Sequence, residues 1–306
     1  MRDRPLPVHR GPMSERLHTH LARRLDSEPV VVATILSTRG ATPRKRGTRM
    51  LITATHTEST IGGGELEARV IAAARALLAS GATATELPIE LNGQPGAAGI
   101  CGGSMRIALR RWDGALDRAR AQAIAAALHS GETVMLDSKD LGAADASETL
   151  QPDIRLLIVG GGHCALALHD LARHLDLELW VYAREAADAS QAAFAAATCL
   201  SGDPQQLALA LDTARTVYAV LLNRDYAADV AALEVLCRKP PAFLGMMGSR
   251  RRIAEVRAAL PTHAQVLESL QAPVGLDIEA QSPHEIAVSI LAQLIAFRNR
   301  PEAAPL

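Results

Sequence analysis

Several kinds of sequence signal are missing from this chain of 306 residues. Its four cysteines, Cys101, Cys164, Cys199 and Cys237, have no Cys-x-x-Cys spacing, which argues against a zinc knuckle and against a disulfide framework. Its ten histidines include no His-x-x-x-His pair, so we expect no metal site made by protein ligands alone. The formal net charge is only -1, and the composition therefore gives no support for binding nucleic acid.

Long apolar runs are missing as well. No uninterrupted stretch is long enough to span a bilayer. Residues 1–12 are polar and rich in proline, and they lack the apolar segment of a signal peptide. We therefore expect a cytoplasmic protein that does not bind membranes.

The pattern of apolar and β-branched residues predicts an α/β protein with two domains. A mixed α/β domain is expected over residues 13–137, and a polar stretch without periodicity predicts a linker over residues 138–153. Over residues 154–300, strands and helices alternate as in a Rossmann-like, doubly wound parallel sheet.

Three transitions from a strand through glycine into a helix carry the candidate anion-binding residues. Glycine lets the backbone approach a ligand closely, and a helix N-terminus offers unpaired N–H groups to an anion. The candidates are Gly63 and Gly64 in the first transition, Gly160, Gly162 and His163 in the second, and Gly248, Ser249 and Arg250 in the third. A turn that serves only helix packing is the alternative for the second transition. In the first, Glu65 and Glu67 would repel an anion.

Two loops in the first half carry further candidates. The loop 37–48 holds Arg44 and several other cations among glycine and proline, which favours either a rigid anion-binding loop or an ordinary solvated loop. Cys101 precedes Gly102 and Gly103, so its sulfur is expected to be approachable and its thiolate to be stabilised by backbone N–H groups. An inert buried thiol is the alternative.

The end of the second strand in the second half does not fit ordinary NAD binding. NAD-binding folds normally place an acidic residue there, about 20 residues after the glycines, where it holds the ribose hydroxyls. This chain has Tyr182 and Ala183 at that point, followed by Arg184. We therefore do not expect NAD(P) as a cofactor.

Seven sequence blocks, in their order and spacing, resemble the XdhC/CoxI family of xanthine dehydrogenase accessory proteins. They are Thr38–Arg44, Ile61–Glu67, Cys101–Gly103, Gly160–His163, Gly245–Arg251, Pro273–Ile278 and Ser282–Ala287. Three departures from the family pattern stand out. Glu65 stands where family members commonly have His or Cys, Tyr182-Ala183 replaces an acidic pair, and Ala165 replaces the last glycine of the loop.

The resemblance implies a non-catalytic maturation factor that binds molybdenum cofactor, as molybdopterin or its dinucleotide form, and protects it during sulfuration. Its implied partners are a molybdenum hydroxylase apo-enzyme of the xanthine or aldehyde dehydrogenase type, which receives the cofactor, and a cysteine desulfurase. A homodimer is the default form of self-association. We hypothesise a cleft between the two halves, with Arg44, Gly248, Ser249 and Arg250 toward the phosphate and Cys101 as the contact to molybdenum.

Two other functions stay open on the sequence alone. The doubly wound half with its Gly160 turn is also typical of an NAD(P)-dependent oxidoreductase, although no obvious acid/base pair accompanies it. The same half would suit a nucleotide-binding regulatory module that transfers no cofactor.

Overall fold

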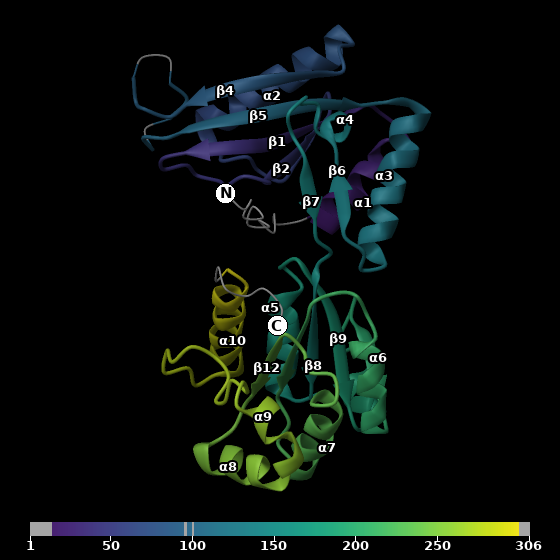
Figure 1. Cartoon of the computed structure of the whole chain (residues 1–306), viewed down its shortest axis with the longest axis vertical. Helices are drawn as coiled ribbons and strands as arrows, with labels where there is room; N and C mark the ends of the chain where they lie inside the picture. The colour runs from purple at the N-terminus through teal and green to yellow at the C-terminus, as the bar shows by residue number, and fades with distance from the viewer. Residues whose placement is uncertain (1–13, 95–96, 100, 300–306) are drawn as a thin grey trace, which may run out of the picture. The chain divides into compact units, whose positions relative to one another are not determined.

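The computed structural model describes residues 14–94, 97–99 and 101–299, and the chain divides into two units between Pro152 and Asp153 (Figure 1). Each unit has its own five-stranded sheet and its own helices. The predicted fold class, a mixed α/β domain followed by a Rossmann-like domain, is confirmed. Among the described residues, no helix combines the length and apolar character needed to cross a membrane.

The sheet of the first unit is antiparallel, with the strand order β3-β2-β1-β5-β4. Its strands are β1 (Val30–Arg39), β2 (Arg49–Ile52), β3 (Thr57–Glu58), β4 (Ala84–Glu90) and β5 (Ser104–Trp112). The β-branched run of β1 lies at the centre, where Val31 is opposite Ile52 of β2 and Arg111 of β5.

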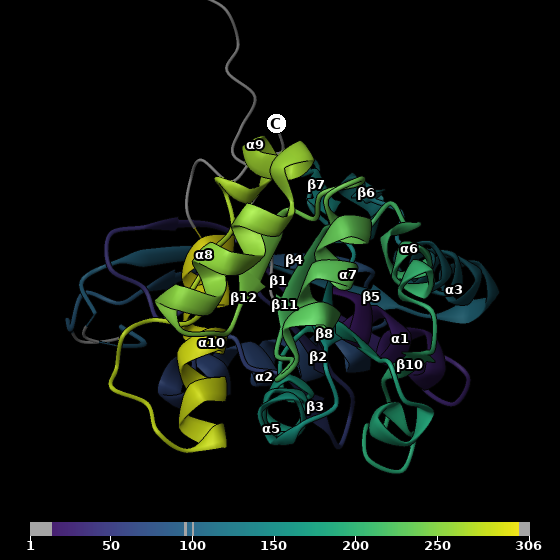
Figure 2. The ribbon, with the colours of Figure 1, turned by 90° about the horizontal axis from the view of Figure 1, so that it is seen from below.

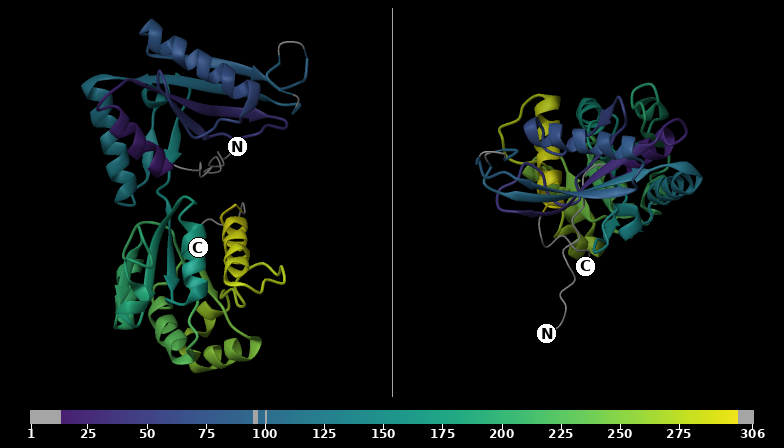
Figure 3. Two further views of the ribbon diagram at one scale, coloured as in Figure 1. Left: turned by 180° about the vertical axis from the view of Figure 1, so that it is seen from behind. Right: turned by 90° about the horizontal axis from the view of Figure 1, so that it is seen from above.

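Helices cover both faces of this sheet, as the left panel of Figure 3 shows. They are α1 (Ser14–Arg24), α2 (Gly64–Ser80) and α3 (Gly114–His129). Since side chains alternate along a strand, Val31 and Ile35 of β1 pack in the core under α2, whereas Val32 packs in the core with α1 and α3. Leu17 and Leu21 lie four residues apart on one face of α1, and both side chains are buried.

The segment 138–153 contains regular structure, although the sequence predicts a linker there. It holds α4 (Ser138–Leu141) and β7 (Glu148–Leu150), and β7 pairs with β6 (Val134–Leu136). A capping box between Asp137 and Asp140 starts α4. A single helical turn and three-residue strands are too short to show periodicity, which is why the prediction missed them.

The sheet of the second unit is parallel, with the strand order β10-β9-β8-β11-β12. Its strands are β8 (Ile154–Val159), β9 (Leu177–Ala183), β10 (Thr198–Ser201), β11 (Val217–Leu221) and β12 (Phe243–Met246). All six residues of the central β8 are buried, as expected for a strand covered on both faces. The edge strand β10 was not predicted, because none of its residues is fully buried and it carries no apolar run.

Helices lie on both faces of this second sheet, which makes it doubly wound (Figure 2). On one face are α5 (His163–Ala172) and α10 (Pro283–Arg298). On the other are α6 (Leu207–Leu211), α7 (Tyr226–Leu236), α8 (Arg250–Ala259) and α9 (Ala264–Leu267). The connections include the 3-10 turns η1 (Ala186–Ala189), η2 (Pro204–Gln206) and η3 (Pro261–His263). A capping box starts α10, with Ser282 and Glu285 as its members.

Candidate functional site

In the first unit, segments that are far apart in the sequence pack closely because glycines stand at their contacts. A Cβ added to Gly103 would lie 2.2 Å from the carbonyl oxygen of Ala41, and one added to Gly40 would lie 3.0 Å from that of Gly102. Gly40 also has a φ of 66°, which favours glycine. The Cys101–Gly103 segment is thus held against the loop that follows β1.

The same loop also contacts the glycine turn before α2. A Cβ on Gly62 would lie 2.9 Å from the Cγ of Pro43 and 2.5 Å from a methyl carbon of Leu66. Residues 39–46, 60–67 and 101–103 therefore form one contiguous region, which we call the first-unit corner. Gly63 and Gly64 both have positive φ and no heavy atom within 4 Å of an added Cβ.

The cations of the loop between β1 and β2, together with Arg39 and Arg49 at its two ends, divide into two groups. Arg39, Arg44 and Lys45 are exposed, and the side chain of none of them has a hydrogen-bond or ion-pair partner among the residues that the structure describes. By contrast, Arg46 donates to the carbonyl oxygen of Ser147 at 3.2 Å. Arg49 is buried, and its Nη2 lies 2.6 Å from a carboxylate oxygen of Glu148. Only the first group can approach an anionic ligand without breaking a contact.

Cys101 is exposed and lies at the first-unit corner. Its neighbour Gly102 has no heavy atom within 4 Å of an added Cβ, so little steric cover surrounds this part of the chain. The other thiols have different surroundings. Burial raises the pKa of Cys199, and it raises that of Cys237 to about 11. Cys101 is therefore the cysteine best placed to meet a ligand.

The carboxylate of Glu67 binds backbone N–H groups of the glycine turn before α2. Oε2 of Glu67 accepts hydrogen bonds from the hydroxyl of Thr60 and from the backbone N–H groups of Ile61 and Gly63, the latter two at 3.1 Å. Burial alone would raise the pKa of Glu67, but these hydrogen bonds outweigh burial and lower it. The N–H of Gly63 is consequently occupied by Glu67.

In the second unit, the three glycines after β8 have different surroundings. Gly160 has a φ of 127°, and its N–H donates to the carbonyl oxygen of Tyr182 at 2.7 Å. A Cβ on Gly161 would lie 2.1 Å from the carbonyl oxygen of Asp188, so a side chain does not fit there. Gly162 is the N-cap of α5 with a φ of -78°, and no heavy atom lies within 4 Å of an added Cβ. Of the three, only Gly162 has no packing or conformational need for glycine.

The turn after β12 uses most of its polar groups internally. Oγ of Ser249 accepts from the N–H of Arg252 and caps α8. Arg251 forms an ion pair with Glu255 at 2.8 Å, and Arg252 forms one with Asp229. Arg250 has no partner in the described part of the chain. Of the predicted anion-binding side chains in this turn, Ser249 is therefore occupied by the helix cap, whereas the guanidinium of Arg250 is available to a ligand.

Sequence reasoning missed Arg224, which follows β11 at the same edge of the sheet. Its Nη2 lies 3.4 Å from Nδ1 of His163, the first residue of α5. Since a guanidinium can only donate, Nδ1 of His163 is the acceptor in this contact. The sequence contains a signal for Arg224, because this residue follows the apolar run of β11 and polar residues at the carboxyl ends of parallel strands gather at one edge of the sheet.

The end of β9 has no carboxylate in the position that binds ribose in NAD-binding folds. Tyr182 is buried, and its hydroxyl donates to the carbonyl oxygen of Gly202 at 2.7 Å. Burial raises the pKa of this hydroxyl, and the nearby Asp203 adds to the effect. Tyr182 therefore has a packing role, and Arg184 after it is exposed.

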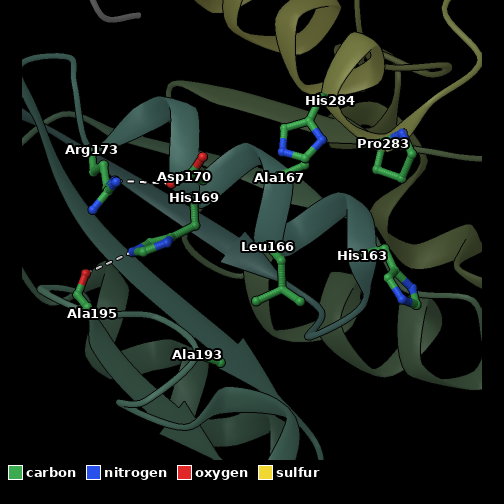
Figure 4. Close-up of a pocket in the computed structure, with 10 residues that line it drawn as sticks. All are labelled: His163, Leu166, Ala167, His169, Asp170, Arg173, Ala193, Ala195, Pro283 and His284. Carbon is green, nitrogen blue, oxygen red and sulfur yellow. Dashed lines mark hydrogen bonds and ion pairs between the residues drawn. The ribbon is translucent and has the colours of Figure 1, made fainter.

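A groove of about 440 Å³ runs along α5 (Figure 4). His163 and Asp170 line it from α5, Arg173 lines it from the C-cap of that helix, and His284 lines it from the start of α10. His169 also lines the groove and is fixed by a 3.0 Å hydrogen bond from its Nε2 to the carbonyl oxygen of Ala195. His163 is the one predicted site residue in this groove. Among the described residues, no group of three or more His, Cys, Asp or Glu side chains is arranged to hold a metal ion.

Comparison with known proteins gives a match on each unit. The profile described as the XdhC and CoxI family matches residues 24–87, and the profile described as the XdhC Rossmann domain matches residues 156–294. A solved structure from Bacillus halodurans, described as a xanthine dehydrogenase, is similar with a TM-score of 0.77 and 23% identity, over 94% of this chain and 98% of that chain. At this level of identity the likeness shows a common fold.

Two curated relatives match this chain over less than half of their own length. The uncharacterized protein YqeB of Escherichia coli K12 is 26% identical over 278 residues, which are 89% of this chain and 44% of YqeB. A protein of Bacillus subtilis 168 described as a probable xanthine dehydrogenase subunit is 27% identical over 156 residues, which are 50% of this chain and 46% of that protein. The chain thus spans less than half the length of these relatives. With a family profile matching on each of its two units, the chain belongs to the XdhC and CoxI family.

Proposed function

We propose that the protein is an accessory factor in the maturation of a xanthine dehydrogenase-type enzyme. In this role it binds molybdenum cofactor, protects it while a cysteine desulfurase supplies sulfur, and delivers it to the apo-enzyme of a molybdenum hydroxylase. The family membership and the Bacillus subtilis relative, described as part of a probable xanthine dehydrogenase, support the choice of client. The proposed role is non-catalytic, with the cofactor as cargo.

The observation that carries the proposal is the composition of the first-unit corner. An exposed thiol, Cys101, lies on a segment packed against a loop with three cations that have no partner among the described residues. Molybdopterin combines a terminal phosphate with sulfur-bound molybdenum. Guanidinium groups such as that of Arg44 are suited to phosphate, and thiolate is a soft ligand suited to a metal in a sulfur environment. The residues of the corner therefore fit the two ends of this cofactor.

The test is to produce the full chain in cells supplied with molybdate and to measure its bound molybdenum and pterin by mass spectrometry. We expect the wild-type protein to carry pterin and Cys101→Ala to carry several-fold less. Cys199→Ala is the matched control, because that thiol is half-buried in the other unit and is expected to leave occupancy unchanged. Wild-type protein without pterin would overturn the proposal. Equal occupancy in wild type and Cys101→Ala would remove the thiol from it.

The second candidate is an NAD(P)-dependent oxidoreductase, which the glycine turn in a doubly wound sheet favours. The buried Tyr182 at the end of β9 weighs against it. Titration with NADH and NADPH separates the two functions. Tight binding of either nucleotide, with hydride transfer to a small carbonyl compound, would favour the oxidoreductase over the accessory factor. A nucleotide without pterin in the mass spectrum would instead favour a regulatory module.

A further inference from the structure

A single buried carboxylate connects the loops at the carboxyl edge of the second sheet. Asp229 of α7 is 0% exposed, and its Oδ1 accepts a 3.0 Å hydrogen bond from Nδ2 of Asn223. Its Oδ2 forms the ion pair with Nη2 of Arg252 at the start of α8. Nη1 of the same Arg252 donates to the backbone carbonyl oxygen of Arg224 at 2.9 Å. Asp229 therefore fixes the segment after β11 both directly and through Arg252.

The fixed segment also contacts the glycine turn after β8. A Cβ added to Gly160 would lie 3.1 Å from Oδ1 of Asn223, so this amide is held between the turn and Asp229. One residue later, the guanidinium of Arg224 reaches His163 at the start of α5. The position of the backbone at residues 223 and 224 thus decides where the guanidinium of Arg224 lies relative to the turn.

A gain in folding stability does not account for the buried carboxylate of Asp229. Burial raises the pKa of Asp229, and the hydrogen bond from Asn223 and the charge of Arg252 only partly oppose that effect. Buried ion pairs commonly contribute little net stability, because desolvation offsets their attraction. What such a pair does supply is a fixed geometry. It also neutralises Arg252, whereas Arg224 and Arg250 at this edge form no ion pair with a carboxylate among the described residues.

We infer that Asp229 is a positioning residue, which acts through Arg252 to hold the guanidinium of Arg224 beside the glycine turn as a contact for a phosphate or diphosphate group. This assignment goes beyond the proposed function, which places Arg44 of the first unit at the phosphate of molybdenum cofactor, and it stands on the geometry of the second unit alone. Arg224 is the residue that contacts the anion, and Asp229 acts only through it.

Binding of inorganic diphosphate to the purified full chain, measured by titration calorimetry, tests this inference. We expect Arg224→Gln to weaken binding about tenfold, as loss of a charge-assisted hydrogen bond does. Asp229→Asn should weaken it by a similar factor in the wild-type background and by less than about twofold in the Arg224→Gln background, because both changes act on one contact. Arg251→Gln is the control, since it removes the same charge from a guanidinium whose ion pair, among the described residues, is with Glu255 of its own helix.

The double variant Asp229→Asn/Arg252→Gln guards against misfolding, because it leaves no unpaired charge in the buried position. It should bind diphosphate about tenfold more weakly than wild type. No binding by the wild-type chain would overturn the inference. So would an Asp229→Asn effect that persists unchanged in the Arg224→Gln background. If diphosphate binding follows the expected pattern and the wild-type chain carries no pterin, the proposed function fails and the inference stands.

Discussion

Replacing the adjacent glycines of the β8 turn one at a time separates packing from ligand approach. Gly161→Ala places a Cβ 2.1 Å from the carbonyl oxygen and 2.6 Å from the Cβ of Asp188, so the turn and the η1 segment have to move apart. Gly162→Ala meets no heavy atom within 4 Å, and its φ of -78° and ψ of -177° are extended backbone that alanine adopts freely. Both variants add one methyl group to a glycine, and they differ in the atoms that surround the added group.

The expected magnitudes differ accordingly. Overpacking of this kind costs about 1–3 kcal/mol of unfolding free energy. In a protein of this size that lowers Tm by roughly 2–12 °C. For Gly162→Ala, the lower entropy of the unfolded chain stabilises by about 0.4–1 kcal/mol. Alanine is also a poorer N-cap than glycine by several tenths of a kcal/mol, roughly the same size. The two effects offset, and the net change should stay within about 0.5 kcal/mol.

Calorimetric unfolding of both full-length variants, followed by titration with inorganic diphosphate, provides the measurement. We expect Gly161→Ala to be destabilised, and Gly162→Ala to match wild type in stability while binding diphosphate more weakly. The second outcome is expected because an anion at the N-terminus of α5 approaches the backbone at Gly162 closely. The reasoning is refuted if Gly162→Ala is destabilised as much as Gly161→Ala, since the surroundings of the two positions would then not control the effect.

Three further predictions concern the first unit and the thiols. Because hydrogen bonds from Thr60 and the backbone lower the pKa of Glu67, its contribution to stability is present above about pH 4.5 and is lost as the pH falls through the lowered value. The stability difference between wild type and Glu67→Gln, from urea unfolding, should therefore shrink in acid, and a constant difference would contradict it. In native protein, iodoacetamide should modify Cys101 rapidly, whereas Cys237, which is buried with a pKa of about 11, should react only on unfolding; peptide mass spectrometry measures both. Gly103→Ala places a Cβ 2.2 Å from a backbone carbonyl oxygen, so it should lower Tm and pterin content together, and an unchanged Tm would argue against the packing of the corner.

The sequence predicted the long, periodic elements of the fold and missed the short ones. The apolar runs of β1 and β8 are buried as expected, and the doubly wound order follows from the alternation of strands and helices. The missed elements, such as β10 and α4, have only four residues each. Such elements are fixed by neighbours distant in the chain, and a local pattern contains no record of those neighbours.

For the candidate site, the sequence located the polar groups and could not show their partners. Arg49 belongs to the same basic stretch as Arg44, yet it pairs with Glu148, which is 99 positions away. Arg252 adjoins Arg251 and Arg250, yet it pairs with Asp229 in a different helix. Whether a guanidinium is free for a ligand depends on these long-range contacts. Neither residue type nor spacing along the chain determines them.

The three glycine turns that the sequence treats alike differ in how their helix N-termini are satisfied. Before α2, the carboxylate of Glu67 accepts from Ile61 and Gly63. At α8, the hydroxyl of Ser249 caps the helix. At α5, the N-cap is Gly162, which has no side chain to offer. An anion at α2 or α8 would have to displace a group of the chain itself, whereas an anion at α5 would not. Changes at the α5 turn should therefore affect anion binding more than equivalent changes at the other two turns.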